Sequence, residues 1–127
     1  MSATVELAAI TVDCPDPAPI AAFYQAAAGG ETVRSEADSA WVRIAGTLWI
    51  FRRVENYQPP TWPSADVPLQ IHMEFYVDDL SVAEHELIGF GATTAEYQSN
   101  RASGLLVMLD PAGHPFCICK RSPEPTS

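Results

Sequence analysis

The sequence is short of positive charge. Its 127 residues include only 7 lysines and arginines against 16 aspartates and glutamates, which gives a formal net charge of −9. A protein that holds nucleic acid or an anionic membrane needs the opposite balance, because it must neutralise phosphates. We therefore expect no nucleic acid and no membrane as partner. A small neutral or cationic molecule, or another protein, fits this charge better.

Cysteines are also few, and their number is odd. Cys14 stands alone, whereas Cys117 and Cys119 are two residues apart and would face the same side of a strand. This arrangement does not make a disulfide framework. The N-terminus lacks a basic leader, and no uninterrupted apolar run approaches the roughly 20 residues of a spanning helix. Together these absences predict a soluble protein of a reducing cytoplasm.

Apolar residues are plentiful enough for one compact domain, since 47% of the sequence is hydrophobic. Strand patterns and helix signals follow the order strand, helix and three strands, and this order occurs twice. In the first half, Asp16 and Pro17 begin a helix that we expect over residues 17–28, before two glycines. In the second half, Asp79 caps the helix and "GFGA" ends it.

The expected boundaries follow from these signals. We expect strands at residues 5–13, 31–36, 40–46, 47–54, 69–77, 93–98, 103–110 and 116–120. The single domain then covers 1–127, with module 1 at 1–54, a proline-rich linker at 55–68, module 2 at 69–120 and a tail at 121–127. The predicted class is α+β, with two tandem βαβββ modules. Each module covers one sheet face with its helix, so the uncovered faces should pair as a curved sheet that encloses a cleft.

Strand alternation predicts which side chains face this cleft. In module 2, Ile71, Met73 and Phe75 should lie against the helix. The opposite, cleft-facing set is Gln70, His72, Glu74 and Tyr76, joined by Cys117 and Cys119 from the last strand. In module 1 the cleft-facing set is Ala9, Thr11 and Asp13, with Leu48, Ile50 and Arg52, whereas Trp49 and Phe51 should lie in the core.

Four segments carry a resemblance to a known family: "DCPDPAPIAAFY", "HMEFYVDDL", "LDPAGHPFCI" and "YQPPTWP". Together they resemble a glyoxalase-like subgroup of the vicinal oxygen chelate superfamily, which includes glyoxalases, extradiol dioxygenases and bleomycin resistance proteins. The resemblance covers nearly the whole chain and implies paired βαβββ modules and a homodimer. It does not set the substrate, because this superfamily hosts unrelated chemistries on one scaffold.

The resemblance also implies a metal centre, with ligands near the start of the first strand and the end of the fourth strand of each module. His72 falls on a ligand position, and Cys117 stands where the family has a closing glutamate. Ala9 has no donor atom, and Arg52 or Phe51 occupies the remaining position. We therefore expect either no cofactor or one divalent metal ion, held by His72 with Glu74 and Cys117 as further ligands.

Two classes of function stay open. One is a glyoxalase-like enzyme, a lyase, isomerase or dioxygenase, in which His72 and Glu74 are catalytic and exchange a proton with the substrate. The other is a non-catalytic protein that binds or sequesters a small molecule or antibiotic, as bleomycin resistance proteins do. In either case the expected ligand-binding residues are Gln70, Tyr76, Arg52, Thr11, Trp62, Cys117 and Cys119. Trp62 would be a lid over the cleft or part of a dimer interface.

Overall fold

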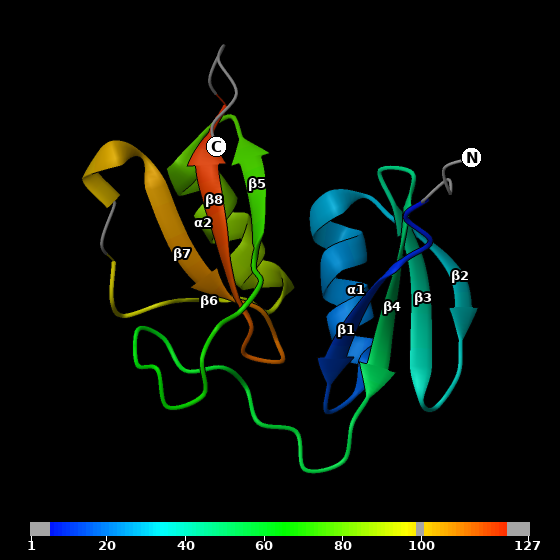
Figure 1. The fold of residues 1–127 in the computed structure, drawn as a ribbon. Coiled ribbons are helices and arrows are strands. Elements are labelled where there is room, and N and C mark those ends of the chain that lie inside the picture. The colour runs from blue at the N-terminus through cyan, green and yellow to red at the C-terminus, as the bar shows by residue number, and fades with distance from the viewer. Residues whose placement is uncertain (1–5, 99–100, 122–127) are drawn as a thin grey trace, which may run out of the picture. The chain divides into compact units, whose positions relative to one another are not determined.

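The protein is seen here in a computed structural model that describes residues 6–98 and 101–121. The chain divides into two compact units, Met1–Tyr57 and Gln58–Ser127. Each unit contains one helix and a four-stranded sheet, in the chain order strand, helix and three strands (Figure 1). The α+β class with two tandem βαβββ modules is confirmed. None of the helices in the described residues is long and apolar enough to cross a membrane.

The first unit forms as its sequence signals predict. Its elements are β1 (Ile10–Cys14), α1 (Pro17–Ala28), β2 (Glu31–Ser35), β3 (Ser39–Ile44) and β4 (Thr47–Arg53). The Asp16 carboxylate accepts a hydrogen bond from the backbone N–H of Ala18, so it satisfies one of the free donors at the start of α1. At the other end Gly29 takes a left-handed conformation with φ 75°, which glycine adopts at low cost.

The sheet of the first unit has the order β1-β4-β3-β2, and β1 runs parallel to β4. Helix α1 covers one face of it (Figure 1). Phe51 is fully buried there and stacks on Tyr24 with ring centroids 5.7 Å apart, while Trp49 is only 7% exposed. Alternation along β4 therefore sends its aromatic side chains into the core and leaves Ile50 and Arg52 on the uncovered face.

The second unit repeats the topology with shorter strands. Its elements are β5 (Met73–Val77), α2 (Leu80–Phe90), β6 (Thr93–Thr94), the 3₁₀ turn η1 (Arg101–Ser103), β7 (Leu105–Leu109) and β8 (Pro115–Lys120). The sheet order is β5-β8-β7-β6, and β5 runs parallel to β8. Asp79 caps α2 by accepting the Val82 N–H at 3.1 Å. Phe116 and Ile118 are buried on the helix side, and Phe75 packs edge-on against Phe116.

Several strand ends differ from the sequence prediction. The first strand begins at Ile10, so Ala9 precedes it, and β5 begins at Met73, so Gln70 and His72 also lie before their strand. Ile71 was expected on the helix side and is instead 79% exposed. A strand ends where its partner ends, and β8 offers partners to β5 only from Met73 onward. Apolar alternation alone does not reveal that limit.

The strand expected at residues 93–98 is also shorter, because β6 contains only two residues. Beyond β6 one more backbone hydrogen bond runs from the Ala95 N–H to the Val107 carbonyl at 3.1 Å, and a side chain then continues the contact. The amide of Gln98 accepts the Val107 N–H at 2.9 Å and donates to the Val107 carbonyl at 2.8 Å. A side-chain amide has the same donor and acceptor pair as a peptide group, so it completes the edge of β7 here.

The turn between β7 and β8 depends on a buried carboxylate. Asp110 is 4% exposed and accepts the backbone N–H groups of Ala112 and His114, at 2.8 and 3.0 Å. Its second oxygen lies 2.9 Å from Nδ1 of His114. Burying a carboxylate is costly unless such donors surround it. This cluster therefore fixes the hairpin that brings β8, and with it Cys117 and Cys119, back beside β5.

We predict that Asp110→Ala destabilises the protein by about 2 to 3 kcal/mol, because it leaves buried N–H groups without an acceptor. Urea unfolding followed by circular dichroism measures this free energy of unfolding. The control is Asp38→Ala, which removes an exposed turn aspartate and should change stability by less than about 0.5 kcal/mol. Equal effects of the two substitutions would contradict the assigned role of Asp110.

Candidate functional site

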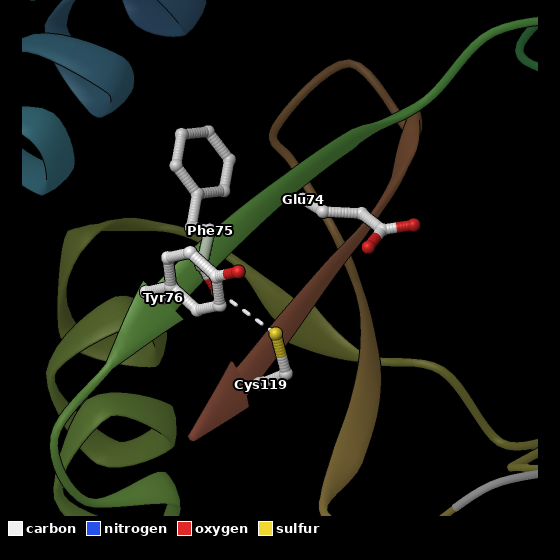
Figure 2. Close-up of a pocket in the computed structure, with 4 residues that line it drawn as sticks. All are labelled: Glu74, Phe75, Tyr76 and Cys119. Atoms are coloured by element: carbon white, nitrogen blue, oxygen red, sulfur yellow. Dashed lines mark hydrogen bonds between the residues drawn. The ribbon is translucent and has the colours of Figure 1, made fainter. Parts of the chain in front are cut away.

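The parallel pairing of β5 and β8 sets the candidate site of the second unit. In this register Glu74 lies beside Cys117 and Tyr76 beside Cys119, so all four side chains belong to the sheet face opposite the helix. A hollow of about 220 Å³ opens on this face, lined by Glu74, Phe75, Tyr76 and Cys119 (Figure 2). The Phe75 ring points away from the Cys119 thiol in Figure 2. The backbone carbonyl of Phe75 accepts a hydrogen bond from this thiol, with 3.8 Å between sulfur and oxygen.

His72 and Glu74 lie together, as the sequence predicted for this pair. Nε2 of His72 is 3.2 Å from Oε2 of Glu74, and the two side chains are 38% and 47% exposed. The pair is therefore open to solvent and to a ligand, although His72 comes just before the strand. An imidazole positioned by a carboxylate in this way is a common arrangement for general acid–base catalysis.

Cys117 and Cys119 differ in their surroundings. Cys119 borders the hollow, whereas Cys117 is only 8% exposed and packs with Ala95 and Val107. Burial raises the pKa of the Cys117 thiol, and the negative charges of Glu74 and then Cys119 raise it further. Because the thiol is favoured over the thiolate there, Cys117 is a poor nucleophile. The expectation that Cys117 is open to the ligand is wrong, since the chain around Ala95 covers it.

On the uncovered face of the first unit, Arg52 forms an ion pair. Its Nη2 lies 2.9 Å and its Nε 3.2 Å from Oδ1 of Asp13, the residue directly beside it in the sheet. Thr11 is exposed on the same face, next to Ile50. The sequence assigned these residues to one face but did not identify Asp13 as the partner of Arg52. The sequence signal for this ion pair was that Asp13 and Arg52 were expected on the same sheet face, on strands that turn out to be neighbours.

The other predicted ligand-binding residues lie away from the hollow. Gln70 is exposed in the segment before β5. Trp62 is 37% exposed and packs edge-on against Tyr97, with ring centroids 6.4 Å apart. Neither residue is among those that line the hollow.

One contact at the hollow was not predicted. Arg121 has its guanidinium carbon 5.4 Å from the centre of the Tyr76 ring, and its Nε lies 3.7 Å from Asp78. The ring at the hollow therefore already holds a cation over its face, a geometry that aromatic rings favour. No periodicity signals this contact, because Arg121 lies beyond the end of β8.

The strand registers also show which position in the first unit is equivalent to which position in the second. Counted back from the helix caps, Ala9 corresponds to His72 and Thr11 to Glu74. The residue beside Thr11 is Ile50, so Ile50 is the first-unit counterpart of Cys117. Assigning that place to Arg52 or Phe51 was therefore wrong by one or two residues. The chemical conclusion is unchanged, because neither Ala9 nor Ile50 has a donor atom.

The two repeated βαβββ units, each with polar side chains on its uncovered sheet face, define the fold class of this protein. A family model described as "Glyoxalase-like domain" matches residues 9–119. The chain therefore belongs to the glyoxalase-like family, within the vicinal oxygen chelate superfamily, as the sequence motifs indicated. A search of curated proteins finds no significant match.

Solved structures support the fold. A mutant of the fosfomycin resistance protein FosX from Listeria monocytogenes, complexed with Mn(II) and 1S,2S-dihydroxypropylphosphonic acid, matches with a TM-score of 0.70 and 18% identity, over 96% of this chain and 94% of its own. A possible glyoxalase from Bacillus cereus gives 0.67 and 12%, over 91% and 99%. A glyoxalase/bleomycin resistance protein/dioxygenase family enzyme from Burkholderia phytofirmans PsJN gives 0.63 and 19%, over 91% and 98%. At these identities the likeness is one of fold.

The residues present do not fit the metal centre that the family implies. His72 and Glu74 are suitable donors, but Cys117 is buried against Ala95 and Val107, and the first unit offers Ala9 and Ile50 at the corresponding places. Across residues 6–98 and 101–121, no group of three or more histidine, cysteine, aspartate or glutamate side chains is arranged to hold a metal ion. A catalytic metal normally needs about three protein ligands.

We predict that the protein retains far less than one metal ion per chain after incubation with zinc, nickel, manganese or ferrous iron and extensive dialysis. Inductively coupled plasma mass spectrometry measures the metal that remains. His72→Ala serves as the comparison, because it removes the histidine that stands on the expected ligand position. Stoichiometric metal that disappears in His72→Ala would overturn this reading of the donor set.

We also predict that Cys119 reacts with iodoacetamide faster than Cys117, with the difference largest near neutral pH. Because the pKa of Cys117 is raised, its thiolate fraction stays low until the pH exceeds the pKa of an ordinary cysteine. Glu74→Gln removes one cause of the raised pKa and should speed alkylation of Cys117. Peptide mass spectrometry follows each site, with buried Cys14 as an internal reference. If Glu74→Gln leaves the alkylation rate of Cys117 unchanged, the electrostatic part of this explanation is contradicted.

Proposed function

We propose that this protein binds a small organic molecule on the uncovered face of the second unit, without a metal ion. The observation that carries the proposal is the hollow in which the Glu74 carboxylate, the Tyr76 ring and the Cys119 thiol come together. A few polar groups beside an aromatic ring are the usual make-up of a small-molecule site. The incomplete donor set separates this site from a metal-dependent one.

The charges of the hollow favour a ligand with a cationic group. Glu74 supplies a carboxylate, and the Tyr76 ring already lies under the Arg121 guanidinium. A ligand cation could take the place of this guanidinium over the ring while it approaches Glu74. The net charge of −9 would further attract a cation. Sequestration of such a molecule is therefore the form of the proposal that the charges support best.

Catalysis is the second candidate, and the contact between His72 and Glu74 favours it. With its ring held at 3.2 Å from the carboxylate, His72 could accept a proton from a bound substrate and return it to another atom. That step suits a lyase or isomerase. A dioxygenase reaction gains no support from the donor set, because activation of O₂ requires a redox-active group.

We place the protein in the cytoplasm, as its free cysteines favour, and propose that it works as a homodimer.

We predict that a thermal-shift screen of organic cations finds ligands whose stabilisation depends on Tyr76 and Glu74. At about 100 times its Kd, a ligand adds about 2.7 kcal/mol of stability, which a small domain shows as a clear rise in Tm. Tyr76→Ala and Glu74→Gln should abolish the rise. Val82→Ala, an exposed change on α2, should leave it intact.

Turnover assays on the ligands found in this way separate the two candidates. A binding protein leaves the ligand chemically unchanged, whereas an enzyme consumes it, and His72→Gln should then lower kcat more than binding. A broad library without a ligand that depends on Tyr76 and Glu74 would count against both candidates.

A further inference from the structure

A second candidate site lies in the first unit, where β1 and β4 end. These parallel strands finish side by side at Cys14 and Arg53, and the Val54 N–H donates to the Cys14 carbonyl at 3.0 Å. Beyond this bond the two segments separate, one through Pro15 into α1 and the other into residues 54–57. The space beyond the carboxyl ends of parallel strands is where many sheets bind ligands.

Two hollows open at this end of the sheet. The larger, of about 430 Å³, is lined by Pro15, Arg53, Val54, Glu55, Asn56 and Tyr57. The smaller, of about 290 Å³, is lined by Pro15, Asp16, Ala37 and Arg53. Arg53 and Pro15 are shared by both. The Arg53 side chain can therefore present its guanidinium to either hollow from a backbone fixed by the hydrogen bond from its N–H to the Asp38 carbonyl, at 2.9 Å.

Among the residues that the structure describes, Arg53 forms no ion pair, in contrast to most arginines of the chain. Ion pairs hold Arg34, Arg52, Arg101 and Arg121. Within the described part of the chain, no acidic side chain forms an ion pair with Arg53. Arg43 also lacks such a partner there, but it lines neither hollow. Arg53 is thus an available cation at a concave surface, and Arg43 is its matched control.

The second unit has an ion pair just beyond the ends of its parallel strands. Its parallel strands end at Val77 and Lys120, and the next residues, Asp78 and Arg121, form an ion pair at 3.7 Å. Counted from the helix caps, Pro15 occupies the place of Asp78. Proline has no group that could neutralise a guanidinium. In the strand register Arg53 corresponds to Lys120 and Val54 to Arg121, so the first unit has neither member of this ion pair, and Arg53 is the basic residue at its strand ends.

We propose that this end of the first unit binds the carboxylate of a small, singly charged organic acid. The planar guanidinium of Arg53 matches a carboxylate in a two-point hydrogen bond, and the Asn56 side chain adds an amide donor. Asn56 sits in a left-handed conformation with φ 55°, which asparagine tolerates better than most residues, and this fixes the turn beside the hollow. Pro15 supplies an apolar wall for the rest of the ligand.

The neighbouring charges limit the ligand to a single negative charge. Glu55 lines the larger hollow and Asp16 the smaller, so a doubly charged phosphate would meet a carboxylate wherever it approached Arg53. The net charge of the chain acts in the same direction. Every residue that lines these two hollows belongs to the first unit, so this proposal stands or falls independently of the function proposed for the second unit.

An NMR titration of the ¹⁵N-labelled full chain tests the proposal, with acetate and inorganic phosphate as probes at constant ionic strength. Acetate should cause saturable shifts of the Arg53 Nε–H and of the amides of residues 54–57, and it should bind more tightly than phosphate. Arg53→Gln should weaken acetate binding about tenfold or more, and Arg53→Lys by less, because a lysine keeps the charge but lacks the two-point geometry. Arg43→Gln should leave the acetate affinity unchanged.

Three outcomes would overturn the proposal. They are shifts that rise linearly without saturation, an acetate affinity that Arg53→Gln does not lower, and tighter binding of phosphate than of acetate. The dispersion of the amide spectrum shows in the same experiment that each variant is folded, so a lost signal cannot be mistaken for lost binding.

Discussion

The parallel pairing of the first and last strand of each unit is the constraint on which the rest depends. A parallel pair fixes which residues lie side by side, and a shift by one residue would turn every side chain to the other face. In the first unit this register joins Asp13 to Arg52, and in the second it sets Glu74 beside Cys117. The chemistry of each uncovered face is therefore decided by the strand register before any side chain adjusts.

The same register shows how the two units have diverged on one backbone plan. The first unit holds an ion pair between Asp13 and Arg52 at places where the second has Tyr76 and Cys119. Its cation is neutralised by the direct neighbour, whereas the Glu74 carboxylate of the second unit lies 3.2 Å from the His72 ring. On the face of the first unit, the charges of Asp13 and Arg52 thus neutralise each other. On the face of the second unit, Glu74 and Tyr76 line a hollow where they can contact a ligand.

Local signals in the sequence predicted the helices better than the strands. Helix α1 was predicted at residues 17–28 and occupies them, because its cap and its terminal glycine act within a few residues of the chain. The start of β5 and the shortness of β6 could not be predicted, since both depend on a partner distant in sequence. The His72 to Glu74 contact was predicted because both residues lie on one short segment. The covering of Cys117 by Ala95 was not, because it needs the tertiary fold.

The protonation of Cys117 connects the fold to the function. At the family position of a closing acidic ligand, an exposed carboxylate would stay ionised, whereas a buried thiol next to Glu74 is held neutral. That exchange removes one negative charge and leaves Glu74 as the carboxylate of this face beside the hollow. A lone carboxylate next to an aromatic ring attracts an organic cation better than it completes a metal shell, because it adds one charge and only one or two oxygen ligands. The proposed binding of an organic cation rests on this combination of one carboxylate and one aromatic ring.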